Sequence, residues 1–193
     1  MKVGFISLGC SKNLVDTEHM MGALKAAGHE IVNDPELADA VVVNTCGFIT
    51  EAKREAIDAI VEMGLLKEQG KFRILLATGC LAQRYPDELL QELPELDAVV
   101  GVKDYLRIPA ILNACEAGQR PKAVSGWPEK YSLQTKRLVS TPPGWAYLKI
   151  AEGCNNRCTY CAIPGIRGPL RSRPKAELIK EAQELADAGV REL

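Results

Sequence analysis

The sequence predicts an α/β protein whose amino-terminal part is a doubly wound domain with a parallel sheet. Two observations support this prediction. Apolar runs alternate with amphipathic helical patterns from the first residue to about Glu116. The runs are continuous stretches of Val, Ile and Leu, which are typical of parallel strands buried on both faces.

The elements of this domain are predicted in the following order. Strands are expected over residues 3–8, 30–32, 40–43, 74–77 and 98–100, and helices over 14–27, 51–66, 87–93 and 105–115. The apolar side of the first helix is predicted to contain Val15, Met20, Met21 and Leu24. At its start, Asn13 and Asp16 are three residues apart, which is typical of helix capping.

The second part of the chain is separated from the first by a linker-like segment. Regular periodicity fails between Gly118 and Gly144, where prolines and glycines are frequent. A strand is then predicted over 146–150 and a helix over 175–188, between Pro174 and Gly189. Residues 190–193 read as the beginning of another strand. One strand, one helix and a partial strand cannot close a sheet, so we expect the chain to be the front part of a longer protein.

The predicted organisation is therefore an α/β domain over 1–117, a linker over 118–144, and the incomplete start of a second domain over 145–193. No apolar run approaches the ~20 residues of a membrane-spanning helix. The apolar opening also lacks a small-residue cleavage site, so we expect a cytoplasmic protein without a membrane anchor.

The charge is distributed unevenly, although the net charge is only −1. Acidic residues outnumber basic ones over 1–117, and basic residues outnumber acidic ones over 118–193. The acidic part by itself is not expected to bind nucleic acid. The basic part faces either an anionic partner or solvent.

The seven cysteines point to metal or redox chemistry, because an odd number cannot be consumed by intramolecular disulfides. The strongest motif is CNNRCTYC, in which Cys154, Cys158 and Cys161 have the spacing C-x₃-C-x₂-C on a loop after a predicted strand. Such short spacings let successive thiolates point at one cluster. A zinc site would usually need a fourth Cys or His, and His19 and His29 lie far upstream. An iron–sulfur cluster is therefore favoured over zinc.

Three further cysteines share one structural position. Cys10, Cys46 and Cys80 each follow a predicted strand, at intervals of about 35 residues, and each has a glycine beside it. Parallel strands end at the same sheet edge, where such folds bind their ligands. We interpret the three as a second ligand set, the alternative being buried thiols at strand ends. Cys115 sits within a predicted helix and is interpreted as an ordinary, partly buried cysteine.

The loop CNNRCTYC resembles the cluster-binding loop of radical S-adenosylmethionine (SAM) enzymes, whose pattern is C-x₃-C-x-aromatic-C. In that family the iron without a protein ligand binds the amino and carboxylate groups of SAM, the aromatic residue lies near the adenine, and the scaffold is a full or partial β/α barrel. The resemblance implies that residues 145–193 are the truncated start of a radical-SAM β/α barrel. It also implies that Tyr160 lies near SAM.

With the three dispersed cysteines, the whole chain resembles the amino-terminal part of a methylthiotransferase. The segments GCSKNLVDTE and CAIPGIRGPLRSRP resemble the branch that modifies an aspartate of a small-subunit ribosomal protein. This resemblance implies two [4Fe-4S] clusters. The first would be held by Cys10, Cys46 and Cys80, and the second, which binds SAM, by Cys154, Cys158 and Cys161.

The chemistry implied by the resemblance has three stages. The SAM-binding cluster delivers one electron to SAM, and the resulting 5′-deoxyadenosyl radical removes hydrogen from the aspartate β-carbon. Sulfur from the first cluster then joins that carbon, and a second SAM supplies the methyl group. The electron donor would be a flavodoxin-type protein. The chain alone is not expected to be a complete catalyst.

Two alternative functions remain open at this point. One is a tRNA adenosine methylthiotransferase with the same machinery, and the other is a non-catalytic iron–sulfur or zinc-binding protein. The loop arginines after the cysteine motif either meet the substrate or the SAM carboxylate or are simply solvated. These residues are Arg157, Arg167, Arg171 and Arg173.

Overall fold

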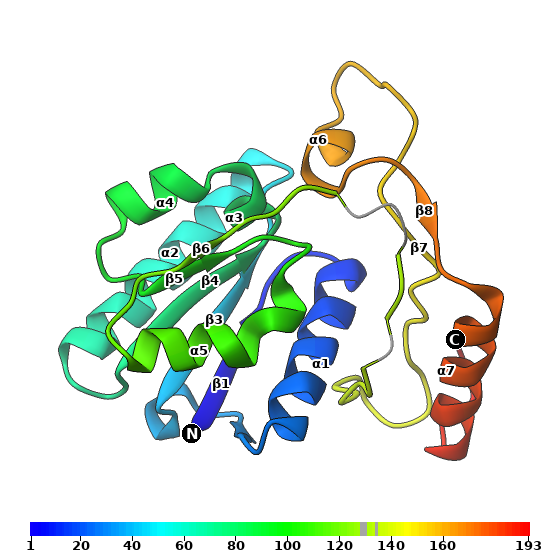
Figure 1. Ribbon diagram of the computed structural model, residues 1–193, viewed down its shortest axis with the longest axis horizontal. Coiled ribbons are helices and arrows are strands. Elements are labelled where there is room, and N and C mark those ends of the chain that lie inside the picture. Colours follow the sequence, from blue (N-terminus) through cyan, green and yellow to red (C-terminus); the bar gives the residue numbers. More distant parts are fainter. Residues whose placement is uncertain (128–130, 134) are drawn as a thin grey trace.

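The computed structural model describes residues 1–127, 131–133 and 135–193. Its centre is a six-stranded parallel sheet with the strand order β2-β1-β3-β4-β5-β6 (Figure 1). The strands are β1 (Lys2–Ser7), β2 (Glu30–Val32), β3 (Ala40–Thr45), β4 (Ile74–Gly79), β5 (Ala98–Val100) and β6 (Lys122–Ala123). In the register, Ser7 pairs with Asn44, and Asn44 pairs with Thr78. The carboxyl ends of β1, β3 and β4 therefore meet at one edge of the sheet.

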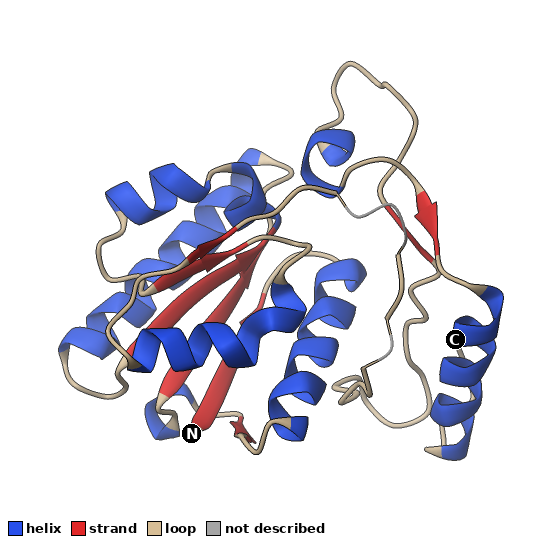
Figure 2. Ribbon diagram, viewed as in Figure 1, coloured by secondary structure: helices blue, strands red, loops and turns tan. Residues whose placement is uncertain are grey.

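Helices cover both faces of the sheet (Figure 2). One face carries α1 (Ser11–Ala26), the 3₁₀ turn η2 (Tyr105–Arg107) and α5 (Ile108–Glu116), and the other carries α2 (Thr50–Glu68), α3 (Cys80–Arg84) and α4 (Pro86–Glu92). A short 3₁₀ turn, η1 (Pro35–Leu37), precedes β3. Alternate residues of one strand enter different cores, because Val42 packs with α1 and α5 whereas Val43 packs with α2. The predicted doubly wound parallel sheet is confirmed.

The remainder of the chain lies beside α1 and above α3 (Figure 1). It contains β7 (Ala151–Glu152), α6 (Ile163–Arg167), β8 (Arg171–Ser172) and α7 (Lys175–Asp187). β7 and β8 pair antiparallel, and Trp145 forms a parallel bridge with Glu192. The backbone at Trp145, before β7, and at Glu192, after α7, thus meets in the parallel sense that a strand–helix–strand unit requires.

The predicted strand over 146–150 is wrong in its position, because the regular strand is Ala151–Glu152. The backbone of 146–150 is bonded at its two ends, where Ala146 donates to the Glu192 carbonyl and Arg173 donates to the Ile150 carbonyl. A strand needs a partner along its length, and these two bonds come from different neighbours. This explains why the apolar pattern did not give a continuous strand.

Two further observations concern the long segment before residue 145. β6 lies within 118–144, so part of the predicted linker adds a strand to the sheet, and the proposed domain boundaries stay a prediction. Among the helices in the described residues, none is long and apolar enough to cross a membrane.

Candidate metal centre

The first set of cysteines is gathered at the sheet edge, each directly beyond a strand. Cys10 is the N-cap of α1 after β1, Cys46 follows β3, and Cys80 is the first residue of α3 after β4. These three strands are neighbours in the sheet, and the strand order reverses between β1 and β3. That reversal point is where doubly wound folds bind their ligands.

Two glycines show how closely the turns approach one another. A Cβ atom added to Gly9, whose φ is 93°, would lie 2.8 Å from the Cys46 Cβ and 3.4 Å from its Sγ. A Cβ added to Gly47 would lie 2.8 Å from the Leu81 backbone nitrogen and 3.0 Å from the Cys80 carbonyl carbon. Only glycine permits these contacts, so the turns after β1, β3 and β4 are packed against each other.

The three thiols of this set differ in exposure. Cys10 is exposed, Cys46 is partly exposed and Cys80 is buried, and all three are free. Burial raises the pKa of Cys80, and the neighbouring Arg167 acts in the opposite direction. Cys80 packs with Val102 and Ile166 in a small apolar cluster. One side of the site is therefore closed and the side of Cys10 is open.

The second set lies on the loop between β7 and α6. Cys154, Cys158 and Cys161 are free and at least partly exposed. The base of the loop is closed by the Cys154 amide, which donates to the Gly168 carbonyl (3.0 Å), and the Cys161 amide donates to the Cys158 carbonyl (3.1 Å). Tyr160 is 85% exposed. The loop is thus anchored at its base and presents its thiols and its aromatic ring to solvent.

The two sets of cysteines supply thiol groups, which can act as ligands of iron–sulfur clusters and of zinc. Within the described ranges, no three Cys, His, Asp or Glu side chains converge to hold one ion. His19, which is buried, has its Nδ1 3.0 Å from the Thr135 hydroxyl. Six free thiols in two sets of three match the thiolate ligands that iron–sulfur clusters require.

A buried ionic network connects the two parts of the chain beside these cysteines. Lys149 Nζ lies 2.5 Å from both Asp16 Oδ1 and Glu152 Oε2, and Arg167 pairs with the same two carboxylates at 3.0 and 2.8 Å. Burial acts to raise the pKa of Glu152, but Lys149 and Arg167 outweigh it and lower the pKa to about 2. For Lys149, burial acts to lower the pKa, and Asp16, Tyr131 and Glu152 raise it above its usual value.

This network corrects two interpretations of the sequence. Asn13 and Asp16 do not cap α1, because Cys10 occupies the N-cap position without a side-chain cap bond and both residues are buried. Asn13 donates to the Leu8 and Thr45 carbonyls instead. The reading of the loop arginines as solvated is also wrong for three of them, which are buried: Arg167, Arg171 and Arg173.

Sequence reasoning missed Lys149 and Glu152 altogether. The available signal was a lysine inside the apolar run AYLKIA, where a charged residue is rarely buried unless it is paired. The partner Asp16 is 133 residues away, and no local pattern indicates a contact over that distance.

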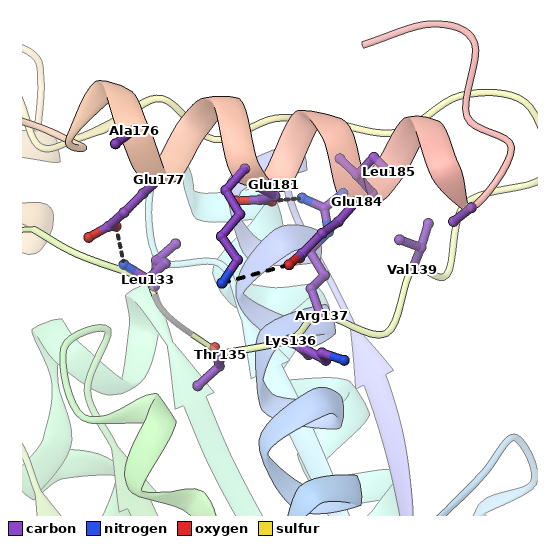
Figure 3. A pocket seen from close by; sticks show the side chains of 12 residues that line it. Leu133, Thr135, Lys136, Arg137, Val139, Ala176, Glu177, Glu181, Glu184 and Leu185 are labelled. Atoms are coloured by element: carbon purple, nitrogen blue, oxygen red, sulfur yellow. Dashed lines mark hydrogen bonds and ion pairs between the residues drawn. The ribbon is translucent and has the colours of Figure 1, made fainter.

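A cavity of about 600 Å³ lies away from the cysteines, between Leu133, residues 135–139 and α7 (Figure 3). Arg137 pairs with Glu181 at 2.8 Å across it, and the Leu133 amide donates to Glu177 (3.1 Å). Lys180 lies 3.9 Å from Glu184 on the same helix. The lining of the cavity contains none of the six cysteines, so the cavity is not part of the metal centre.

Comparison with known protein families gives one match to each of the two regions that contain the cysteine sets. The model described as "Uncharacterized protein family UPF0004" matches residues 2–101, which is more than half of the chain. The chain belongs to this family. The matched region of the UPF0004 family contains Cys10, Cys46 and Cys80, and the model of the radical SAM superfamily matches residues 148–193, which contain the second set.

Individual relatives extend over both regions. The chain is 56% identical to the ribosomal protein uS12 methylthiotransferase RimO of Syntrophomonas wolfei and 48% identical to that of Clostridioides difficile, in each case over the whole chain and 44% of the relative. For Symbiobacterium thermophilum RimO the identity is 50%, over the whole chain and 40% of the relative. The chain thus spans less than half the length of these curated relatives. These matches confirm the resemblance to the amino-terminal part of the ribosomal-protein methylthiotransferases.

Proposed function

We propose that the chain is part of a radical SAM methylthiotransferase that acts on ribosomal protein uS12, at the β-carbon of an aspartate. The observation that supports this most strongly is the presence of two separate cysteine triads. One follows three neighbouring strands, and the other lies on a loop with radical SAM spacing. The relatives that match the whole chain carry the name of this activity.

Each of the two sets of cysteines would hold one [4Fe-4S] cluster. Cys154, Cys158 and Cys161 would hold the cluster that binds SAM, with Tyr160 near the adenine. Cys10, Cys46 and Cys80 would hold the other cluster, beside the sheet. When bound, these cofactors supply radical cleavage of an aliphatic C–H bond and a source of sulfur, which acid–base side chains cannot provide.

The chain's own residues would position the two cysteine sets and leave them accessible to SAM, the electron donor and the substrate. The loop base, closed between Cys154 and Gly168, holds the second triad on the exposed side, where SAM and a flavodoxin-type electron donor can reach it. The open side of the first triad, at Cys10, leaves room for a substrate side chain. The buried pairs of Lys149 and Arg167 keep the loop region against α1.

The number of clusters is tested by anaerobic reconstitution of the chain, followed by iron and sulfide analysis. We expect two clusters in the unmodified chain and one in the triple variant Cys10→Ala/Cys46→Ala/Cys80→Ala. Cys115→Ala is the matched control and should retain both, because Cys115 lies in α5 away from the sheet edge. Bound zinc, or a single cluster in the unmodified chain, would refute the two-cluster proposal.

The substrate is tested separately in cells that carry or lack the gene. Mass spectrometry of purified uS12 and of digested tRNA will locate the methylthio group. We expect it on an aspartate of uS12 only in cells that carry the gene. A methylthio group that depends on the gene and appears on tRNA adenosine would instead establish the tRNA-modifying alternative.

A further inference from the structure

Arg167, which follows the second cysteine set, is almost completely buried, with a relative exposure of 1%. It is the last residue of α6, a short helix that begins two residues after Cys161. The helix is held over the sheet edge by Ile166, which packs on Cys80 and Val102. Arg167 thus extends from the loop of one cysteine set toward a cysteine of the other.

The guanidinium group of Arg167 contacts that cysteine directly. Its Nε donates to Cys80 Sγ at 3.4 Å, and its Nη2 donates to Asn13 Oδ1 at 2.6 Å. The same Asn13 oxygen lies 3.6 Å from Cys80 Sγ. The sulfur is therefore bracketed by an arginine N–H and an asparagine carbonyl, which fixes the direction of the Cys80 side chain.

The other edge of the guanidinium is held by two carboxylates. Nη1 donates to Asp16 Oδ2 at 3.0 Å and to Glu152 Oε2 at 2.8 Å. One planar group thus bonds to α1, α3 and β7 at once. An ammonium group could keep the carboxylate contacts, but it lacks the planar fork needed to reach the sulfur in the same geometry.

We propose that Arg167 is a positioning residue for the cluster held by Cys10, Cys46 and Cys80. Its Nε–H···Sγ bond orients Cys80 and raises the reduction potential of that cluster, and its remaining bonds fix the distance between the two cysteine sets. Hydrogen bonds to ligand sulfurs are a recognised determinant of iron–sulfur potentials. The proposal rests on the proposed function, because it requires Cys80 to be a cluster ligand.

The test uses Arg167→Lys in a background that isolates one cluster. Replacement of Cys154, Cys158 and Cys161 by Ala leaves only the first site, whose midpoint potential is measured by an anaerobic redox titration followed by electron paramagnetic resonance. Loss of the N–H···S bond should shift the potential downward while the iron content is retained. The control is Arg173→Lys, since Arg173 is also buried but bonds to the Lys149 and Leu133 carbonyls and pairs with Glu181. It should leave the potential unchanged.

Two outcomes separate failure of this proposal from failure of the proposed function. If Cys80→Ala in the same background retains the cluster, Cys80 is not a ligand and the two-triad function is wrong. If Cys80→Ala loses the cluster while Arg167→Lys leaves the potential and the spectrum unchanged, the function stands and the role of Arg167 is refuted.

A second measurement applies if Arg167→Lys does not fold. The single-cluster chain is labelled with ¹⁵N-arginine, reduced, and studied by pulsed electron paramagnetic resonance. We expect a nitrogen coupling that is transmitted through the N–H···S bond and is replaced by the ¹⁵N pattern on labelling. Absence of a coupling that responds to the label would overturn the proposal.

Discussion

At the scale of single residues, the distinctive feature is a helix whose polar side chains are buried. In α1, Asp16, Glu18 and His19 have exposures of 3%, 1% and 1%. Glu18 accepts from the Ser140 amide and hydroxyl at 2.7 and 2.9 Å and pairs with Arg137 at 2.9 Å. Buried polar groups are stable only when they are paired, so the segment that covers α1 has to supply polar partners for these side chains.

His19 gives this polar layer a specific pH dependence. Burial lowers the pKa of His19 from 6.5 to about 4, Glu181 and Asp16 oppose this, and Arg137 and Lys149 reinforce it. The folded protein therefore binds fewer protons than the unfolded chain between pH 6.5 and 4. The contribution of His19 to the free energy of unfolding is complete above pH 6.5 and is lost as the pH falls toward 4. Urea unfolding at several pH values should show this decline.

The variant His19→Gln supplies the control for this prediction. Glutamine does not titrate, so the slope of the unfolding free energy between pH 6.5 and 4 should become smaller, whatever the stability at neutral pH. An unchanged slope would mean that other groups cause the loss in acid.

At the scale of elements, the site depends on how closely three turns approach each other. Gly47→Ala would place a Cβ 2.8 Å from backbone atoms of Leu81, which cannot move without shifting α3. We expect a loss of about 1–3 kcal/mol in the free energy of unfolding, measured with denaturant, because overpacking forces backbone shifts. The first cluster should also reconstitute less completely.

Gly126→Ala is the matched control, because an added Cβ there meets no atom within 4 Å. It should unfold at the same denaturant concentration as the unmodified chain and take up both clusters. If Gly47→Ala behaves in the same way as this control, the turns are less tightly coupled than their contacts indicate.

The elements also show what the sequence could and could not predict. The strands at 30–32 and 98–100 were predicted with their observed bounds, because short apolar runs in a parallel sheet are flanked by clear turn signals. Helix α6 and the pair β7–β8 were missed, since five- and two-residue elements have no measurable period. The common edge for Cys10, Cys46 and Cys80 followed from topology alone. The buried roles of Asp16 and Arg167 did not, because they depend on contacts across 151 residues.

At the scale of the whole molecule, residues 135–140 connect the sheet domain to α7. Arg137 pairs with Glu18 of α1 at 2.9 Å and with Glu181 of α7 at 2.8 Å, and the Leu138 amide donates to the Glu18 carbonyl. In Arg137→Met, Glu181 keeps its ion pair with Arg173, but the buried Glu18 loses its ion pair with Arg137. Removing one partner of a buried ion pair typically costs about 3–5 kcal/mol, so the segment should open more often. Hydrogen exchange of the Leu138 amide should become faster.

Lys136→Met serves as the control for this last prediction, because Lys136 is exposed on the same segment. Its effect on the exchange of the Leu138 amide should be small, since surface substitutions usually change stability by less than about 0.5 kcal/mol. Equal protection of Leu138 in the Arg137 variant and in this control would contradict the bridging role of Arg137.

The ionic contacts between α1 and residues 137–167 have a consequence for how the chain is made. Asp16 and Glu18 are synthesised more than a hundred residues before Lys149, Arg167 and Arg137, their eventual partners. Until those residues are synthesised, this side of α1 exposes carboxylates to water instead of an apolar surface. Before the rest of the polypeptide is synthesised, a nascent sheet domain therefore does not expose on this side an apolar patch that would promote aggregation.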